Sequence, residues 1–174
     1  MASRVSALVI RPMVLGDADP ISHAFAGIGS DKPAREYLDY VAAEGRGEVA
    51  TFSAWSDGVF AGYVVLSWSS GWPAFAEERI PEIKDLNVLP AFRRRGIASQ
   101  LLAAAEERAA ERSAVVGIGV GMTADYGAAQ RLYVRRGYVP DGRGLTTGGR
   151  PVQYGERVRV DDDLVMYFTR APRG

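Results

Sequence analysis

The sequence contains no cysteine and a single histidine, His23, among its 174 residues. Without cysteine the chain can form no disulfide, no thiolate-bound metal and no cysteine acyl-enzyme intermediate. One histidine cannot build a histidine-rich metal centre. We therefore expect no bound metal.

The sequence also lacks an excess of charge and a long apolar run. Lys and Arg number 21, as do Asp and Glu, so the formal net charge is zero. A general nucleic-acid binder needs positive charge in excess over one face. No apolar stretch approaches the roughly 18 residues of a membrane span, and the run at residues 7–10 is too short for a signal peptide. We expect a cytoplasmic protein with no nucleic-acid partner and no membrane insertion.

Internal repeats, low-complexity tails and interdomain linkers are missing as well. Hydrophobic residues make up 47% of the chain and charged residues 24%, which is ordinary for a globular protein. A chain of this length suits one hydrophobic core. We expect a single domain over residues 1–174, while the oligomeric state, including a homodimer, stays open.

The most informative stretch, residues 82–111, reads as a strand, a basic turn and a long helix. The strand covers residues 82–88 and ends at Leu89-Pro90, because proline has no N–H to donate to a sheet. The helix covers residues 97–112. Its apolar residues recur at helical spacing on one stripe, which consists of Ile97, Leu101, Leu102, Ala105 and Ala109.

The turn between them, Arg93-Arg94-Arg95-Gly96, has the chemistry of an anion site. The first four N–H groups of a helix lack partners within the helix, and the helix dipole places partial positive charge there. Gly96 has no side chain to block approach, and three arginines surround it. These features predict a site for a phosphorylated ligand. The alternative is a capped helix with a solvated basic turn.

The remaining patterns predict strands and helices on both sides of this unit. An Asp57-Gly58 hairpin joins two of the strands, and the nearly continuous apolar run at residues 114–120 is typical of a buried parallel strand. We expect strands at 5–14, 48–55, 59–68, 114–120, 138–139 and 164–169, the last closing the sheet. We expect a short helix ending at residue 25 and further helices at 32–44 and 125–136 with Asp125 as a cap. We expect a loop at 69–79 and a loop or wide hairpin at 140–155.

Two short motifs resemble those of the GNAT family, the GCN5-related N-acetyltransferases. Arg93-x-x-Gly96-x-Ala98 resembles the acyl-CoA pyrophosphate motif of that family, Gln/Arg-x-x-Gly-x-Gly/Ala. Residues 126–138 resemble its C-terminal signature, Asn-x-x-Ala-x-x-Leu-Tyr-x-x-x-Gly-Phe/Tyr. Tyr126 stands in place of the asparagine, so a contact by that asparagine is not carried over. The resemblance covers about residues 5–169.

The resemblance implies an α/β fold with a mixed sheet. Its order is strand, two helices, three strands, helix, strand, helix and two strands, which matches the order of the predicted elements. In this fold the fourth and fifth strands run parallel but splay apart. The cofactor is then expected between those two strands.

The resemblance also implies acetyl-CoA as co-substrate and a primary amine that attacks the thioester directly in a ternary complex. Backbone N–H groups would bind the pyrophosphate, and the strand before the turn would bind the pantetheine arm. The amide of Val88 would polarise the thioester carbonyl. The cofactor-binding residues are then Leu86, Asn87, Val88, Arg93, Arg94, Arg95, Gly96, Ile97, Ala98 and Ser99.

The catalytic residues implied are Tyr133, Glu82 and Asp85. Tyr133 holds the family position of the general acid that protonates the leaving thiolate; packing in the core is the alternative. Glu82 stands where some members have a catalytic glutamate, and we rank it ahead of Asp85 as the base, with water or another residue left open. Glu82 could instead be a solvated charge, and Asp85 the partner of an arginine. Side chains three apart on a strand face opposite sides unless a bulge intervenes.

Two other function classes fit the same patterns. One is a non-catalytic acyl-CoA-binding sensor on the same fold, since fold does not fix function. The other is a nucleotide-binding module that uses the same helix start. For an enzyme the acceptor could be a small-molecule amine, an amino acid or a peptide N-terminus. Its site is expected from residues 25–40, 72–75 and 140–154, unless Trp72 and Phe75 pack over the core edge instead.

Overall fold

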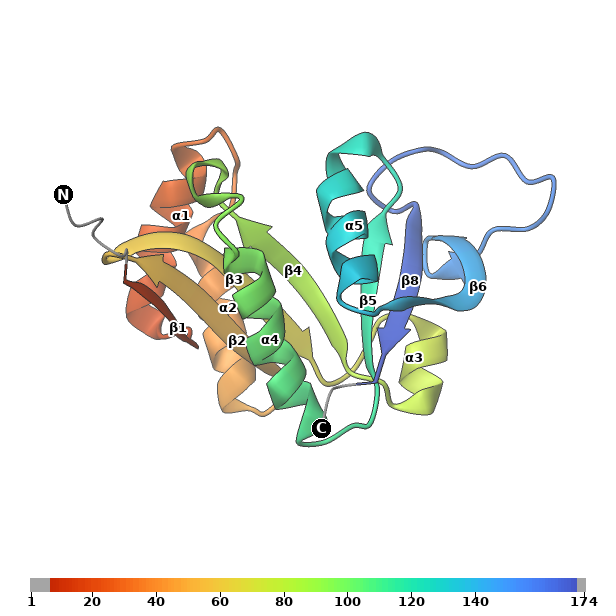
Figure 1. The fold of residues 1–174 in the computed structure, drawn as a ribbon, viewed down its shortest axis with the longest axis horizontal. Coiled ribbons are helices and arrows are strands. Elements are labelled where there is room, and N and C mark those ends of the chain that lie inside the picture. Colours follow the sequence, from red (N-terminus) through yellow and green to blue (C-terminus); the bar gives the residue numbers. More distant parts are fainter. Residues whose placement is uncertain (1–6, 172–174) are drawn as a thin grey trace. The chain divides into compact units, whose positions relative to one another are not determined.

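The computed structural model describes residues 7–171, which cluster into two compact units (Figure 1). The first unit contains residues 7–66 and 85–105, and the second contains residues 67–84 and 106–171. Strand β4 (Glu82–Val88) and helix α4 (Ile97–Ala110) each contribute residues to both units. The architecture is the expected α/β class with a mixed sheet.

The first unit is built on four strands in the order β1, β2, β3 and β4. They are β1 (Leu8–Pro12), β2 (Val49–Ser56), β3 (Val59–Ser67) and the second part of β4. Figure 1 shows α1 (Ala18–Ala26) and α2 (Ala34–Gly45) on one face of these strands and α4 on the other. Both Asp57 and Gly58 have positive φ, at 50° and 81°, so the hairpin predicted between β2 and β3 is confirmed.

Aromatic side chains dominate the core of this unit. Tyr37 and Tyr63 are completely buried, with ring centroids 5.4 Å apart in an edge-to-face arrangement. Phe25 on α1 packs against both. The helical stripe predicted on α4 is also confirmed, because all five of its residues are buried.

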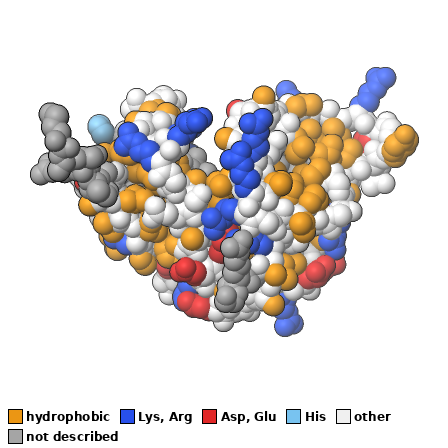
Figure 2. Space-filling view, viewed as in Figure 1, with side chains coloured by type: hydrophobic (Ala, Val, Ile, Leu, Met, Phe, Trp, Pro, Cys, Tyr) orange, Lys and Arg blue, Asp and Glu red, His pale blue; other side chains and the backbone are white. Residues whose placement is uncertain are grey.

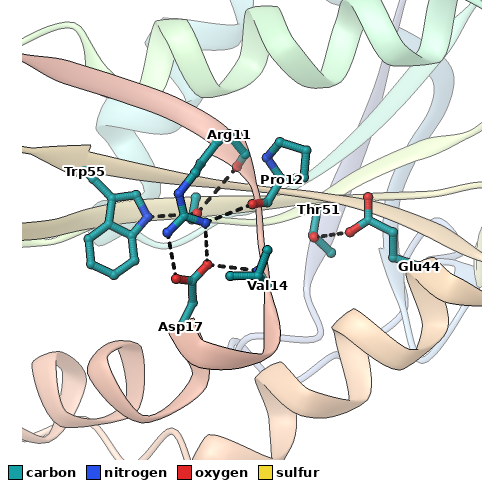
Figure 3. A network of polar contacts seen from close by, with 8 residues as sticks. Arg11, Pro12, Val14, Asp17, Glu44, Thr51 and Trp55 are labelled. Carbon is teal, nitrogen blue, oxygen red and sulfur yellow. Dashed lines mark hydrogen bonds and ion pairs between the residues drawn. The ribbon is translucent and has the colours of Figure 1, made fainter. Parts of the chain in front are cut away.

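An ion pair ties β1 to the start of α1 (Figure 3). The Arg11 guanidinium donates two hydrogen bonds of 2.7 Å to the buried Asp17 carboxylate, and it lies 5.1 Å from the centre of the Trp55 ring. The Val14 N–H donates to the same carboxylate at 2.9 Å. Asp17 therefore holds the chain where it leaves the edge strand, through η1 (Leu15–Asp17), for the helix.

The second unit carries strands in the order β4, β5, β8, β6 and β7. They are the first part of β4, β5 (Val116–Gly121), β8 (Val165–Arg170), β6 (Val139–Thr147) and β7 (Arg150–Pro151), with α3 (Pro73–Glu78), η3 (Ala124–Tyr126) and α5 (Gly127–Arg135). β4 and β5 are parallel, and their pairing covers only Glu82 with Gly117 and Ile83 with Ile118. Such short pairing agrees with the expected splaying of the two strands.

Glycines on β5 accommodate aromatic rings. A Cβ at Gly117 would lie 2.2 Å from the Phe75 ring, and one at Gly121 would lie 2.5 Å from the Tyr126 ring. Rings can lie directly on the strand because these positions have no side chain. β5 is therefore buried as predicted, and aromatic side chains from other segments fill the space beside its glycines.

Residues 69–79 are not a loop throughout, because α3 occupies part of them. Proline is favoured at the first helical position, where Pro73 stands, and Arg79 ends the helix with φ 56°. Trp72 and Phe75 are only 2% and 1% exposed. The expectation that Trp72 and Phe75 line the acceptor site is therefore wrong, and the alternative that they pack over the edge of the core is confirmed.

In the C-terminal part of the sheet the hairpin alternative for residues 140–155 is confirmed, because Gly148-Gly149 turns β6 into β7 and the two strands pair. The predicted strand at 138–139 was too short, since β6 runs to Thr147. β6 finds its hydrogen-bond partner in β8, which lies between β5 and β6 and so does not close the sheet at its edge. A register shift between Pro140 and Leu145 accommodates the intervening glycines.

The start of α5 and the start of the first strand were also predicted. Asp125 does not cap α5, because the helix begins after Tyr126 and has no side-chain cap; the Asp125 carboxylate accepts a hydrogen bond from Thr123 instead. The predicted first strand began at residue 5, and residues 5 and 6 lie outside the described part of the chain.

Candidate active site

The turn before α4, with η2 (Pro90–Phe92) ahead of it, leaves the helix start open to a ligand. Gln100 is the first residue whose N–H bonds back, to the Gly96 carbonyl at 3.1 Å. The N–H groups of Ile97, Ala98 and Ser99 precede that bond and so have no acceptor within the helix. Gly96 has φ 78°, and a Cβ there would meet no described atom within 4 Å.

The three arginines of the turn are all exposed. Lys and Arg side chains stand at the surface where Figure 1 places this turn (Figure 2). Arg93 donates from Nε to the Val88 carbonyl at 3.2 Å, and the Arg95 guanidinium lies 5.4 Å from the centre of the Phe92 ring. Arg94 has a left-handed backbone with φ 62°. Positive charge is thus concentrated beside the unpaired N–H groups.

The segment Leu86–Val88 lies in the same unit, next to β3. The Leu89 N–H donates to the Ala61 carbonyl at 2.9 Å. A Cβ at Gly62 would lie 2.4 Å from the Asn87 carbonyl oxygen and 3.1 Å from Val88 Cα. Sequence reasoning missed Gly62, although a glycine inside an apolar strand indicates a close backbone approach.

Asp85 interrupts β4 just before that segment. Its φ of 52° is left-handed, so the simple alternation of faces does not extend across it from Glu82. The Asp85 carboxylate accepts a hydrogen bond from the Tyr40 hydroxyl of α2, and its carbonyl accepts one of 3.1 Å from the Asn87 side chain. The partner of Asp85 is therefore a phenol, whereas the alternative considered for it was an arginine.

A charged and phenolic cluster surrounds this contact. Lys32 donates from Nζ to the Tyr63 hydroxyl at 3.1 Å, lies over the Phe25 and Tyr63 rings, and is 3.8 Å from Glu36. Burial raises the pKa of Tyr63 far above its usual value, and neighbouring Tyr37 and Asp85 raise it further. The phenol stays protonated at neutral pH.

Tyr37 lies in the same cluster. Its hydroxyl is buried and has no partner in hydrogen-bond geometry among the described residues. Burial raises the pKa of Tyr37, as do Glu36 and Asp85, while the nearby Tyr63 hydroxyl partly offsets the rise. The Tyr37 hydroxyl therefore lies near that of Tyr63 without a well-aligned hydrogen bond to it.

Glu82 belongs to the second unit, where it is half-buried. Its carboxylate accepts a hydrogen bond of 2.5 Å from the Ser70 hydroxyl, which itself accepts one of 2.9 Å from the Trp72 N–H. Burial raises the pKa of Tyr167 to about 12, with Glu82 and Asp141 adding to the effect. Glu82 is therefore more than a solvated charge at the start of a strand.

Tyr133 lies on α5, also in the second unit. Its side chain is buried, and its ring centre is 5.9 Å from that of Tyr138. Burial raises the pKa of Tyr133 to about 12, with a contribution from Tyr126. Tyr126, which replaces the asparagine of the signature, lies against Gly121 and donates to Asp162 at 3.2 Å.

The predicted site residues thus fall into two groups. The first unit holds Asp85 together with the cofactor segments 86–88 and 93–99, and the second holds Glu82 and Tyr133. The model for the Acetyltransferase (GNAT) family matches residues 20–138. That range is well over half of the chain and includes every one of these residues.

The chain belongs to the GNAT acetyltransferase family. Its fold is shared by solved structures of low sequence identity. The yncA protein of Salmonella typhimurium, solved with its cofactor acetyl-CoA, is 17% identical, with a TM-score of 0.69 over 96% of this chain and 95% of that one. An N-acetyltransferase from Staphylococcus aureus Mu50 is 19% identical, with a TM-score of 0.71 over 97% and 100%.

A third similar structure is an acetyltransferase from Salmonella typhimurium that modifies the N-terminal serine of ribosomal protein L7/L12. It is 15% identical, with a TM-score of 0.68 over 94% of each chain. No curated protein sequence matches this GNAT chain.

In residues 7–171 no group of three or more His, Cys, Asp or Glu side chains is placed to hold a metal ion. None of the helices within that range is long and apolar enough to cross a membrane.

Proposed function

We propose that this GNAT protein transfers the acetyl group of acetyl-CoA to a primary amine. The observation that carries the proposal is the open helix start at Gly96, with its arginines, next to a strand whose backbone lies close to β3 at Gly62. Unpaired N–H groups and arginines are suited to a pyrophosphate. An extended backbone beside them is suited to the amides of a pantetheine arm.

We propose direct attack of the amine on the thioester within a ternary complex. The amine nitrogen forms a bond to the acetyl carbon, the C–S bond breaks, and the thiolate takes a proton from the Tyr133 hydroxyl. The second proton that the nitrogen loses after attack returns to Tyr133 through solvent, so the phenol is restored. The Val88 amide would stabilise the negative charge that develops on the thioester oxygen. A base removes the proton of the acceptor ammonium, with Glu82 and Asp85 as the candidates. Residues 1–174 would act as a single domain.

The acceptor is proposed to be a small-molecule amine or the N-terminus of a peptide. The S. typhimurium relative that modifies an N-terminal serine supports the second class. The acceptor would contact residues 25–40, where Lys32 and Glu36 carry charge, and residues 140–154. Trp72 and Phe75 do not belong to this surface, because both are buried.

Binding is tested by the thermal shift that acetyl-CoA produces. Ligand at about a hundred times its dissociation constant stabilises a protein by roughly 2.7 kcal/mol. We expect Gly96→Glu to abolish the shift, because the carboxylate would occupy the anion site. Gly47→Glu is the matched control, since Gly47 also has positive φ, at 74°, and open space within the described structure. A normal shift in the Gly96 variant would place the cofactor elsewhere.

Turnover is tested with acetyl-CoA and a panel of primary amines, amino acids and short peptides with free N-termini. Release of the CoA thiol that depends on one of these acceptors is the expected result. Binding of acetyl-CoA without turnover of any member would contradict the enzyme proposal.

A further inference from the structure

Three independent features meet at Asp85. Its backbone is left-handed in the middle of a strand, a conformation that is disfavoured for residues other than glycine and is tolerated best by Asn and Asp. Its carboxylate accepts a hydrogen bond from the Tyr40 hydroxyl, and its carbonyl accepts one from the Asn87 side chain. A strained backbone persists where its surroundings hold it, and such positions cluster at functional sites.

We propose that Tyr40 is a positioning residue for catalysis, which holds the Asp85 carboxylate in the orientation that accepts a proton from the acceptor ammonium. The inference rests on the proposed function and goes beyond it in naming Asp85 as the base and Tyr40 as the group that orients it. One ammonium proton moves to a carboxylate oxygen of Asp85, and the nitrogen lone pair it leaves attacks the acetyl carbon. The C–S bond then breaks, and CoA leaves as a thiolate that is protonated as proposed above.

A phenol is suited to this task because it orients a carboxylate without neutralising it. Burial raises the pKa of Tyr40 far above its usual value, and the hydrogen bond to Asp85 raises it further. Tyr40 therefore remains a neutral donor at the pH of the reaction. An arginine in the same place would pair its full positive charge with the carboxylate and make it a weaker base.

The position of the Tyr40 hydroxyl is set by α2. Tyr37, one turn earlier on that helix, is completely buried against Phe25 and Tyr63, so the helix cannot easily rotate. Tyr40 and Asp85 are themselves only half-buried, which leaves the carboxylate within reach of an acceptor.

Other titratable groups face this contact. Glu36, Tyr37 and Tyr40 come from α2, Tyr63 comes from β3, and Lys32 reaches the cluster through the Tyr63 hydroxyl. Of these described groups, the Tyr40 hydroxyl is the one that donates a hydrogen bond to the Asp85 carboxylate. A change confined to the Tyr40 hydroxyl therefore probes the orientation of Asp85 with little change in charge.

The test compares Tyr40→Phe, Asp85→Asn, Glu82→Gln and the Tyr40→Phe/Asp85→Asn double variant. Asn tolerates the left-handed backbone, so Asp85→Asn should keep the fold. Glu111→Gln is the control, because Glu111 is exposed, pairs with Arg108 and lies outside the proposed site. The assay measures kcat and kcat/KM against pH with acetyl-CoA and the best acceptor from the amine panel, together with the acetyl-CoA thermal shift.

We expect Tyr40→Phe to lower kcat roughly tenfold or more, since small misplacements of a catalytic group are costly. Asp85→Asn should remove the acidic limb of the profile, and the double variant should be no slower than Asp85→Asn. The acetyl-CoA thermal shift should stay at the wild-type value.

A second measurement needs no acceptor. Carbon-13 NMR of labelled Asp85 reports the environment of its carboxyl group, whose chemical shift at neutral pH should change in Tyr40→Phe and stay at the wild-type value in Glu111→Gln. An unchanged carboxyl chemical shift in Tyr40→Phe overturns the proposal, as does a Tyr40→Phe enzyme with the wild-type kcat. Loss of the acidic limb in Glu82→Gln and its retention in Asp85→Asn would also overturn it.

Failure of the proposed function has a different signature. In that case the wild type itself shows no acetyl-CoA shift or acetylates no amine, and the positioning role falls with it. When the wild type turns over and Tyr40→Phe does not differ from it, only the positioning role is lost.

Discussion

Burial of Tyr133 has a direct chemical consequence at the scale of a single residue. Its side chain is 5% exposed, and burial raises its pKa to about 12. At neutral pH the phenol therefore keeps its proton and can donate it toward the sulfur as negative charge develops there. Because a thiol titrates near pH 8.5, the phenolate is the stronger base, so the transfer is completed only when Tyr133 regains a proton from the acetylated nitrogen through solvent. The same burial fits a packing residue, and only a change confined to the hydroxyl separates the two roles.

We predict that Tyr133→Phe lowers kcat by at least about tenfold while acetyl-CoA affinity stays nearly constant. General acids typically contribute about 10²–10⁴-fold, and the bound is modest because a thiolate leaves fairly well without help. Single-turnover kinetics and the acetyl-CoA thermal shift measure the two quantities. Near-normal turnover in a folded variant, with chemistry limiting the rate, would reduce Tyr133 to a packing residue.

At the scale of elements, the close approach of β3 and β4 shapes the proposed cofactor segment. Gly62 brings the two backbones so near that an added Cβ would lie 2.4 Å from the Asn87 carbonyl oxygen. Backbone cannot move aside as a flexible side chain can. Any larger residue at Gly62 must therefore displace the segment that is proposed to bind the pantetheine arm.

We predict that Gly62→Ala destabilises the fold by about 1–3 kcal/mol, as overpacking typically does, and weakens acetyl-CoA binding as well. Urea unfolding and the thermal shift measure the two effects. Gly45→Ala is the control, because a Cβ at Gly45, on α2, meets no described atom within 4 Å. If Gly62→Ala bound acetyl-CoA normally, the exact course of β4 would not matter for the cofactor.

At the scale of the whole molecule, one buried carboxylate links stability to pH. Glu106 of α4 is buried, and its carboxylate accepts hydrogen bonds from Arg136 and Tyr138 and pairs with Arg170 at 2.5 Å. Burial alone would raise the pKa of Glu106. The hydrogen bonds from Arg136 and the ion pair with Arg170 outweigh it, so the pKa lies below its usual value of 4.5.

The sign of the pH effect follows from that direction. A carboxyl group with a depressed pKa contributes stability above its unfolded value, and this contribution is lost as pH falls through the folded value. We predict that Glu106→Gln destabilises the protein by about 3–5 kcal/mol at neutral pH, because two arginines lose their counter-charge. The difference between wild type and variant should shrink below about pH 4.5.

Urea unfolding at several pH values measures this difference. Glu111→Gln is the control, since Glu111 forms only an exposed pair with Arg108, and such pairs contribute at most about 1 kcal/mol. A difference for Glu106→Gln that does not change with pH would show that its effect is one of packing rather than of charge.

Local patterns in the sequence determined the strand, turn and helix at residues 82–111 and the hairpin before them. The strand Glu82–Val88 lies within the predicted bounds, and the hairpin at Asp57-Gly58 and the buried stripe of α4 are as expected. Each depends on residues close in sequence. A proline ends the strand, the turn needs residues that tolerate positive φ, and the apolar residues of the helix recur at helical spacing. The two motifs that resembled the GNAT family are also short and local.

The tertiary structure alone decided the contacts between distant residues. Tyr40 meets Asp85 across 45 positions of sequence, and β6 extends to Thr147 because β8 offers it a hydrogen-bond partner. Trp72 and Phe75 are buried although their surroundings in sequence are those of a loop. No local pattern encodes such pairs, because their partners become neighbours only when the strands align and the helices pack on them.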